Sequence, residues 1–188
     1  EGFPAGQVGA RTAMSSHLLV EAMKHAYADR AFYLGDPAFI DTPMTRLLSK
    51  DYAAKLRAAI DPAKARRAAD IVPLIAVPRE GDNTTHYSVV DADGNAVANT
   101  YTLNFGYGLG MVAEGTGVLL NNELDDFTAA HGAANAFGLV GFAANLPGAN
   151  KRPLSSMSPT ILLKDGKVVL VTGSPGGSRI ITTVLQII

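Results

Sequence analysis

The chain has 188 residues, 17 of them acidic and 16 basic, and it contains no cysteine. A unit of this length can bury roughly 70% of its unfolded surface, so one good-sized domain needs no disulfide or structural metal. The balanced charge, without a basic stripe, makes nucleic acid or an anionic membrane surface a poor prediction for a partner. The lack of cysteine excludes thiol nucleophiles, zinc–thiolate sites and disulfides.

Neither end of the sequence has the features expected of a natural terminus. No apolar run reaches transmembrane length, and the first residues lack the basic region and apolar block of a signal peptide. The chain opens on Glu1-Gly2-Phe3-Pro4 without a methionine and closes on an apolar helix or strand, 184–188, without a stop signal. We therefore expect a piece of a longer protein.

The first third of the sequence has helical patterns separated by turn residues. Each expected helix follows a residue that can cap it or start its first turn. The expected helices run from Ser15-Ser16 to about Arg30, from Thr42-Pro43 to about Leu48, from Ser49 to Asp61-Pro62, and over 63–69 after Asp61. A polar, proline-bounded linker follows and ends at Asn83.

From Thr84 onward the pattern changes to strands and turns. Residues 85–91 and 96–103 predict a hairpin that turns at Asp93-Gly94, which places Thr84 opposite Thr102. A second hairpin is expected to pair 160–163 with 167–171 around Asp165-Gly166. Between the hairpins we expect a buried strand, 118–120, and a long loop, 129–150, of the kind that is usually functional or disordered.

Three polar motifs are candidates for a site, and each has a plainer interpretation. The turn Gly176-Gly177 can direct backbone N–H groups at an anion, or it is a tight turn. The hydroxyls of Ser155 and Ser156 can bind a carboxylate, or they form a turn before a strand. The carboxylates in 121–126 suit a metal or an ammonium group, or they are a solvated acidic turn. Taken alone, each motif favours the plainer interpretation.

The sequence predicts no metal site and no cofactor. Asp91-Ala92-Asp93-Gly94-Asn95 superficially resembles a calcium loop, but its glycine stands at the fourth position and no glutamate stands at the twelfth. We predict a turn there. None of the histidines shows the spacing of a zinc-binding helix: His17, His25, His86 and His131.

Read in order, five segments resemble the gamma-glutamyltransferase (gamma-glutamyltranspeptidase) family. The resemblance covers essentially all of 84–188, and residues 26–37 resemble the end of that family's large subunit. The five segments are Thr84-Thr85-His86-Tyr87-Ser88-Val89-Val90, Thr100-Tyr101-Thr102-Leu103-Asn104, the run 119–127, the run 151–159 and the run 173–179. Their shared order and spacing outweigh the plainer interpretations of the single motifs.

The resemblance implies an α+β fold of the N-terminal nucleophile hydrolase type, with stacked antiparallel sheets flanked by helices and incomplete in this piece. It implies that a precursor cuts itself between Asn83 and Thr84. Residues 1–83 are then the helical end of the large subunit plus a linker. Residues 84–188 are the small, catalytic subunit, truncated at its C-terminus.

The resemblance also assigns roles to individual residues. Thr84 is implied as the nucleophile, with its freed α-amine as the general base, because a cut before a threonine gives it a base of its own. The remaining implied roles are orientation of the Thr84 hydroxyl by Thr102, binding of a glutamyl α-ammonium by Asn104, Glu123 and Asp126, binding of its α-carboxylate by Ser155 and Ser156, and oxyanion stabilisation by the N–H groups of Gly176 and Gly177.

The implied reaction is acyl transfer from glutathione or another γ-glutamyl compound to water or to acceptor amino acids or peptides. The implied location is the periplasm or the outside of the cell. Residues 129–144 correspond to a lid over the site, in which Phe137 replaces a tyrosine common in the family. We expect the isolated piece to have little transferase activity.

Two other interpretations remain open. A cephalosporin acylase of the same superfamily would use the same nucleophile on a different acyl group. A homologue that does not process itself would act as a structural or binding module. The acidic set Asn104, Glu123 and Asp126 favours a glutamyl donor over the acylase.

Overall fold

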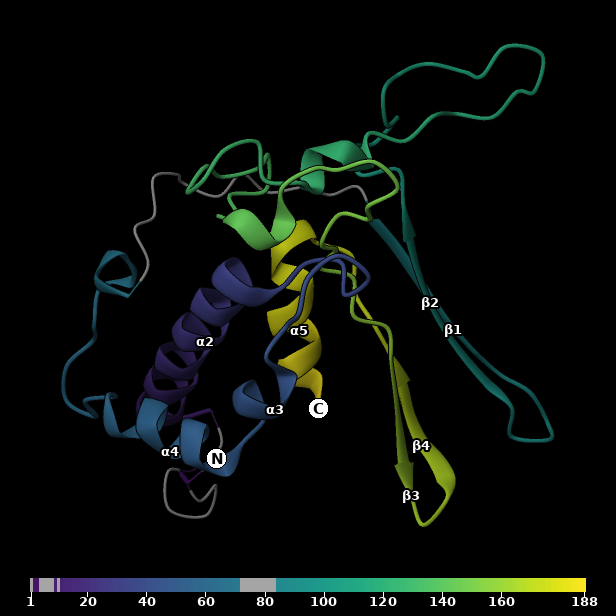
Figure 1. Cartoon of the computed structure of the whole chain (residues 1–188). Helices are drawn as coiled ribbons and strands as arrows, with labels where there is room; N and C mark the ends of the chain where they lie inside the picture. Colours follow the sequence, from purple (N-terminus) through teal and green to yellow (C-terminus); the bar gives the residue numbers. More distant parts are fainter. Residues whose placement is uncertain (1, 4–8, 10, 72–83) are drawn as a thin grey trace. The chain divides into compact units, whose positions relative to one another are not determined.

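The computed structural model describes residues 2–3, 9, 11–71 and 84–188, which fall into two compact units. The first unit combines 1–76 with 128–134 and 140–152, and the second combines 77–127, 135–139 and 153–188. Figure 1 shows the helices α2, α3 and α4 of the first unit and the strands β1 to β4 of the second. The predicted cut falls after Asn83, which lies outside the described residues.

The first unit is built around the long helix α2, Ala13–Tyr33. The predicted cap at Ser15-Ser16 is wrong, because the helix begins earlier, with Thr12 as its N-cap. The Thr12 Oγ1 accepts the Ser15 N–H at 3.0 Å, and the Ser15 Oγ accepts the Thr12 N–H at 2.9 Å. This reciprocal capping box satisfies two N–H groups that the first turn cannot pair.

Two shorter helices follow, α3 (Met44–Leu47) and α4 (Lys50–Ala58). The predicted cap of α4 is confirmed, because the Ser49 hydroxyl accepts the Tyr52 N–H at 3.2 Å. Thr42 does not cap α3, since its hydroxyl donates to the Tyr33 carbonyl at 3.2 Å instead.

The predicted helix over 63–69 is wrong, and only the 3₁₀ turn η1, Ala68–Asp70, forms there. The Asp61 carboxylate accepts the Ala63 N–H at 2.8 Å, which makes a local side-chain turn. The Arg66 N–H donates to the Glu21 carboxylate at 3.1 Å. A contact with a distant helix therefore occupies a backbone group that the expected helix would use.

The segments 128–134 and 140–152 complete the first unit. The predicted loop 129–150 contains a bridge between Ala134 and Val140 and the 3₁₀ turn η3, Ala143–Asn145. The Phe142 ring stacks on the Phe32 ring of α2, with centroids 4.2 Å apart and planes 11° apart. This stretch is therefore attached to α2 of the same unit.

The second unit contains both predicted hairpins. Strands β1 (Thr84–Val90) and β2 (Ala96–Thr102) pair antiparallel with Thr84 opposite Thr102, as the turn position predicted. Strands β3 (Thr160–Lys164) and β4 (Lys167–Thr172) form the other hairpin, with an irregularity between Leu162 and Leu163.

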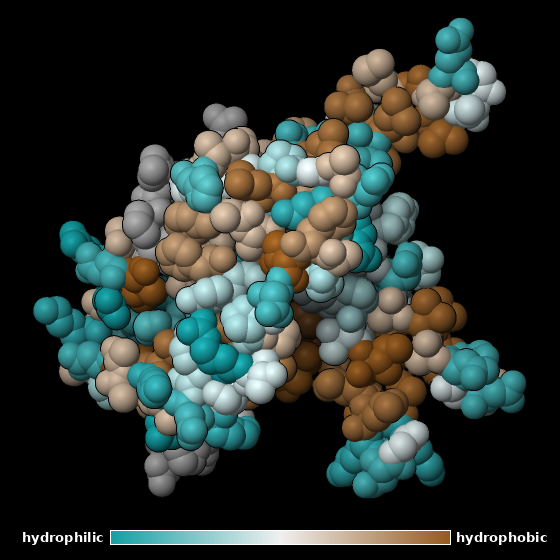
Figure 2. Space-filling view, viewed as in Figure 1, coloured by the Kyte–Doolittle hydropathy of each residue, from teal (hydrophilic) through white to brown (hydrophobic). Residues whose placement is uncertain are grey.

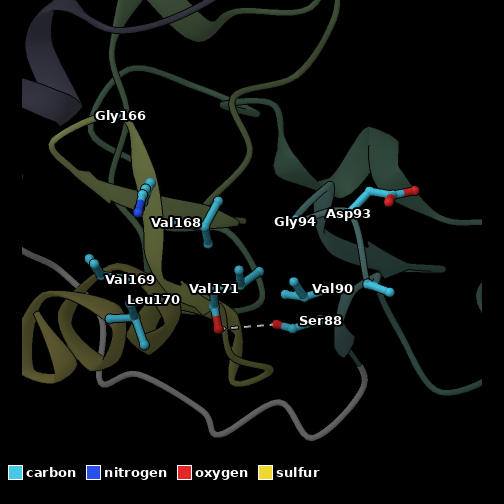
Figure 3. Close-up of a pocket in the computed structure, with 11 residues that line it drawn as sticks. Ser88, Val90, Asp93, Gly94, Gly166, Val168, Val169, Leu170 and Val171 are labelled. Carbon is cyan, nitrogen blue, oxygen red and sulfur yellow. Dashed lines mark hydrogen bonds between the residues drawn. The ribbon is translucent and has the colours of Figure 1, made fainter.

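The two hairpins enclose a groove near their turns, which Figure 3 shows in close-up. Its walls are mainly apolar, with Val90 from β1 and Val168 and Leu170 from β4. The Ser88 hydroxyl crosses from β1 to donate to the Val171 carbonyl at 3.3 Å. This bond joins the two hairpins at the inner end of the groove, toward the end where Thr84 lies.

The predicted buried strand at 118–120 is wrong. Residues 105–120 fold back on themselves as an arm, in which Leu119 makes a single bridge to Val112. Val118 is 58% exposed, and Leu120 is 37% exposed. Figure 2 shows apolar residues gathered on this arm. No neighbouring strand among the described residues pairs with it, so the apolar run does not become buried.

The second unit ends with the 3₁₀ turn η4, Gly177–Arg179, and the helix α5, Ile180–Ile187. The final apolar stretch, which the sequence predicted to be either a helix or a strand, is thus helical. Within the part of the chain that the structure describes, no helix is long and apolar enough to cross a membrane.

Replacing Thr12 by Ala should lower the free energy of unfolding by about 1 kcal/mol, because the first turn of α2 loses its cap. Ser16→Ala is the matched control, since Ser16 was expected to cap but lies inside the helix. Urea unfolding followed by circular dichroism measures both changes. Equal losses for the two variants would contradict the assignment of Thr12 as the cap.

Candidate active site

Thr84 is the first residue of β1, and its side chain faces Thr102 across the ladder. The Thr84 hydroxyl donates to the Thr102 Oγ1 at 3.4 Å. The Thr102 Oγ1 also accepts the Asn104 N–H at 2.9 Å. The backbone that follows β2 therefore holds the hydroxyl that faces Thr84.

A small pocket at this end of the hairpin brings together most of the predicted site residues. Glu123 and Gly176 do not line it, although each lies close in sequence to a residue that does. The lining residues are Thr84, Thr102, Asn104, Asp126, Phe137, Ser155, Ser156, Met157, Gly177 and Ile180. The pocket combines hydroxyl, amide and carboxylate groups with one aromatic ring.

Asn104 is buried, with 4% of its surface exposed, and its backbone has a φ of 74°. Asparagine tolerates this left-handed conformation better than most residues. Its amide nitrogen donates to the Asn122 carbonyl at 3.1 Å, and the Asn122 side chain accepts the Phe105 N–H at 2.9 Å. Asn122, which the sequence did not single out as a site residue, therefore joins the end of β2 to the acidic segment.

Glu123 and Asp126 lie on one 3₁₀ turn, η2 (Glu123–Asp126). The Glu123 Oε1 is buried and has no hydrogen-bond partner among the described residues. Burial, and then the charge of Asp126 and a hydrogen bond with it, raise the pKa of Glu123 to about 7. Two carboxyl groups held this close favour a cation beside them, or a proton shared by the pair.

The two serines stand in a segment outside helices and strands that leads into β3. The Ser155 Oγ accepts the Met157 N–H at 3.1 Å, and the Ser158 hydroxyl donates to the Ser156 carbonyl at 3.1 Å. The plainer interpretation, a serine turn before a strand, is therefore realised at Ser155. Both serines nevertheless line the pocket, so the turn also presents them to it.

Gly176 and Gly177 connect β4 to α5 through η4, with φ angles of 124° and 53°. Both angles lie in the region where L side chains are strained. A Cβ on Gly177 would also lie 2.8 Å from the Phe137 ring. The turn therefore requires glycine, and it brings backbone to the wall of the pocket without a side chain in the way.

Phe137 lies at the centre of the expected lid, in the segment 135–139 that belongs to the second unit. It is 8% exposed, and its ring meets Phe105 edge-on at 5.9 Å. The Asn135 Oδ1 accepts the N–H groups of Phe137 and Leu139, each at 3.0 Å. Asn135, which the sequence analysis missed, therefore shapes the turn that places Phe137 against Gly177. An asparagine two residues before the aromatic residue was the available signal.

A family model for gamma-glutamyltranspeptidase matches residues 1–188. The chain belongs to the gamma-glutamyltranspeptidase family. It is 57% identical over 185 residues to the glutathione hydrolase proenzyme of Pseudomonas sp. (strain A14), covering 98% of this chain and 32% of that protein. The chain is also 56% identical over 188 residues to the glutathione hydrolase proenzyme of Escherichia coli (strain K12), covering 100% of this chain and 32% of that protein. This family member thus spans about a third of the length of these relatives.

Solved gamma-glutamyltranspeptidases confirm the expected fold class. The T380A mutant of the Helicobacter pylori gamma-glutamyltranspeptidase is 65% identical over the aligned part, with a TM-score of 0.53 and coverage of 55% of each chain. The enzyme of Pseudomonas nitroreducens complexed with L-DON is 59% identical, with a TM-score of 0.54 and coverage of 55% and 53%. The family member described here has the N-terminal nucleophile hydrolase fold in part, with its hairpins and helices.

The carboxyl group of Glu123 should titrate near pH 7, well above its ordinary pKa of 4.5. The folded protein holds the Glu123 proton more tightly than the unfolded chain does. The protonated carboxyl group therefore stabilises the folded state fully below about pH 4.5, and this contribution is lost as the pH rises toward 7. Asp126→Asn should lower the pKa of Glu123 by removing the neighbouring charge. Carbon-13 NMR of the glutamate side chains measures both values, and an ordinary pKa in the unmodified protein would contradict the prediction.

Proposed function

We propose that the full-length protein is a gamma-glutamyltransferase and glutathione hydrolase that activates itself by a cut before Thr84. The observation that carries the proposal is the 3.4 Å contact between the hydroxyls of Thr84 and Thr102 in a pocket that Asp126 and Ser155 also line. Two of its relatives are named glutathione hydrolase proenzymes, which supports both the activity and the processing.

The cut would convert Thr84 from an internal residue into a nucleophile with its own base. A free α-amine has an ordinary pKa of about 7.7–8.0, which suits a base near neutral pH. This amine would take the proton of the Thr84 hydroxyl as its oxygen attacks the γ-carbonyl carbon. Thr102, itself held by the Asn104 N–H, would keep the hydroxyl oriented for that attack.

The rest of the pocket suits the free α-ammonium and α-carboxylate of a glutamyl group. Asn104, Glu123 and Asp126 would bind the ammonium, and the hydroxyls of Ser155 and Ser156 would bind the carboxylate. The ammonium would supply the positive charge that the two crowded carboxyl groups favour. Its arrival would lower the pKa of Glu123, so substrate binding below about pH 7 would release a proton.

The proposed reaction has two acyl-transfer steps. In the first, the Thr84 oxygen forms a γ-glutamyl ester, and the leaving amine takes the proton held by the α-amine. The N–H groups of Gly176 and Gly177 would stabilise the oxyanion that forms on the γ-carbonyl oxygen. In the second step, water or the amine of an amino acid or peptide attacks the ester and restores the threonine.

A second candidate function is that of a cephalosporin acylase. The acylase ACY 1 proenzyme of Pseudomonas sp. (strain SE83) is 37% identical over 188 residues, covering 100% of this chain and 31% of that protein. Such an enzyme would use Thr84 in the same way on a different acyl group. The crowded carboxyl groups at Glu123 and Asp126, with the Glu123 Oε1 buried, favour an acyl group with an ammonium, so we prefer the glutamyl donor.

We further propose that the boundary between the subunits of the processed protein is the bond between Asn83 and Thr84. Residues 1–83 would then end the large subunit, and 84–188 would begin the small one. The resemblance to the family supports a periplasmic or secreted location for the whole protein. The isolated chain of 188 residues should have little transferase activity, because it spans about a third of the related proenzymes.

Thr84→Ala should abolish the cut in the full-length protein, because no hydroxyl remains to attack the preceding bond. Thr85→Ala is the matched control, since Thr85 pairs with Tyr101 on the opposite side of the ladder. Electrophoresis and N-terminal sequencing should show a second band beginning Thr-Thr-His-Tyr in the unmodified protein. A second band beginning Ala-Thr-His-Tyr in the Thr84 variant would rule out self-cleavage by this residue.

Asp126→Asn should raise KM for a γ-glutamyl anilide by roughly 10–100-fold in the processed protein, because a hydrogen bond to a charged group is worth about 1.5–3 kcal/mol. Asp125→Asn is the control, because Asp125 binds Asn122 and does not line the pocket. Steady-state kinetics with the anilides of γ-glutamate and of glutarate, which lacks the ammonium, distinguishes the two candidate functions. Faster turnover of the glutaryl compound would favour the acylase.

A further inference from the structure

Asp36, in the loop after α2, has a side chain that is only 1% exposed. Its Oδ2 accepts the Arg152 N–H at 2.9 Å and the Arg152 Nε–H at 3.0 Å. Its Oδ1 accepts the Arg152 Nη2–H at 2.7 Å and the Ala38 N–H at 3.1 Å. One buried carboxylate therefore receives the guanidinium fork and two backbone N–H groups.

This arrangement fixes both the charge and the geometry of the pair. The hydrogen bonds from the Arg152 side chain, followed by that from its backbone, hold the pKa of Asp36 far below its usual range. The carboxylate is therefore charged near neutral pH. A bidentate guanidinium–carboxylate pair is directional, so the backbone of Arg152 is fixed beside the loop that carries Asp36.

The two partners lie 116 residues apart, on opposite sides of the proposed cut after Asn83. Other contacts of the first unit also span the cut. The Phe32 and Phe142 rings stack, and a Cβ on Gly35 would lie 2.2 Å from the Ala144 carbonyl oxygen. The first unit is therefore assembled from chain on both sides of the bond that would break.

We propose that the Asp36–Arg152 pair is the joint that holds the two pieces of the processed chain together. The inference rests on the proposed cut, because without it the pair joins two parts of one chain. The ion pairs Glu21–Lys24 and Asp70–Arg67 instead join residues three positions apart on one side of the cut. Such local pairs cannot resist separation of the pieces, whereas the Asp36–Arg152 pair must break when they part.

The test compares Asp36→Asn with Asp70→Asn in the processed full-length protein. Both substitutions remove a carboxylate that a guanidinium binds through two nitrogens. Asp36→Asn should raise the dissociation constant of the two pieces at least about 10-fold, the effect of losing a hydrogen bond to a charged group. Asp70→Asn should leave the constant within about 2-fold of the unmodified value. Sedimentation or native mass spectrometry on dilution measures it.

A second variant guards against misfolding of Asp36→Asn. The Arg152 side chain is 73% exposed, so Arg152→Gln should fold, and it keeps the backbone N–H that binds Asp36. It should weaken the association in the same direction. If either variant blocks processing, the two pieces are coexpressed as separate chains and the same constants are measured. Equal dissociation constants for the Asp36, Arg152 and Asp70 variants would contradict the proposal that the Asp36–Arg152 pair holds the pieces together.

The outcomes also separate this inference from the proposed function. Absence of any cut in the unmodified protein would contradict the proposed self-activation. The role of the Asp36–Arg152 pair would then be tested with the coexpressed pieces. A normal cut with unchanged association in Asp36→Asn would contradict the joint alone. Combining Asp36→Asn with Thr84→Ala should give one uncut chain that does not separate on dilution, which confirms that separation requires the cut.

Discussion

The pairing register of β1 with β2 is the constraint on which the candidate site depends. Side chains alternate along a strand, so a slip of one residue would turn Thr84 to the opposite side of the sheet and remove Thr102 from it. The turn secures the register, because the Asp91 carboxylate accepts the N–H groups of Asp93 and Asn95 at 3.0 and 2.8 Å. His86 secures it again nearer the site, with its ring 2.7 Å from the Thr100 hydroxyl.

Besides the hairpin, each other part of the site is positioned by a backbone whose conformation is restricted by its residues and contacts. Asn104 takes a left-handed conformation and binds Asn122, which carries the chain into the acidic turn. The positive φ angles of Gly176 and Gly177 disfavour a side chain at either position, and Phe137 fills the space beside Gly177. The polar groups are therefore arranged before any ligand arrives. Such preorganisation is what electrostatic catalysis requires, since the protein need not rearrange during the reaction.

The sequence predicts those elements whose cause is local. Asp-Gly turns predict both hairpins and the register of the first, and Ser49 predicts the start of α4 from its own side chain. The failures have distant causes. Arg66 gives its N–H to Glu21 in place of continuing a helix, and the apolar run at 118–120 has no strand to cover it among the described residues. Asn122 was missed for the same reason, because its partners in Asn104 and Phe105 lie 18 and 17 residues away. Asn135 was missed although its partners, the N–H groups of Phe137 and Leu139, are local.

A protein that is activated by a cut in its own chain must also keep the two resulting pieces together. Breaking the bond before Thr84 would give the nucleophile its base, but it would also remove the link that keeps two segments at a high effective concentration. The contacts that span the cut must then supply the whole of the association free energy. A buried carboxylate with four N–H donors suits this task, because its pairing is directional and independent of pH over the working range. If such contacts form before the cut, the two pieces would stay together when the Thr84 amine is released.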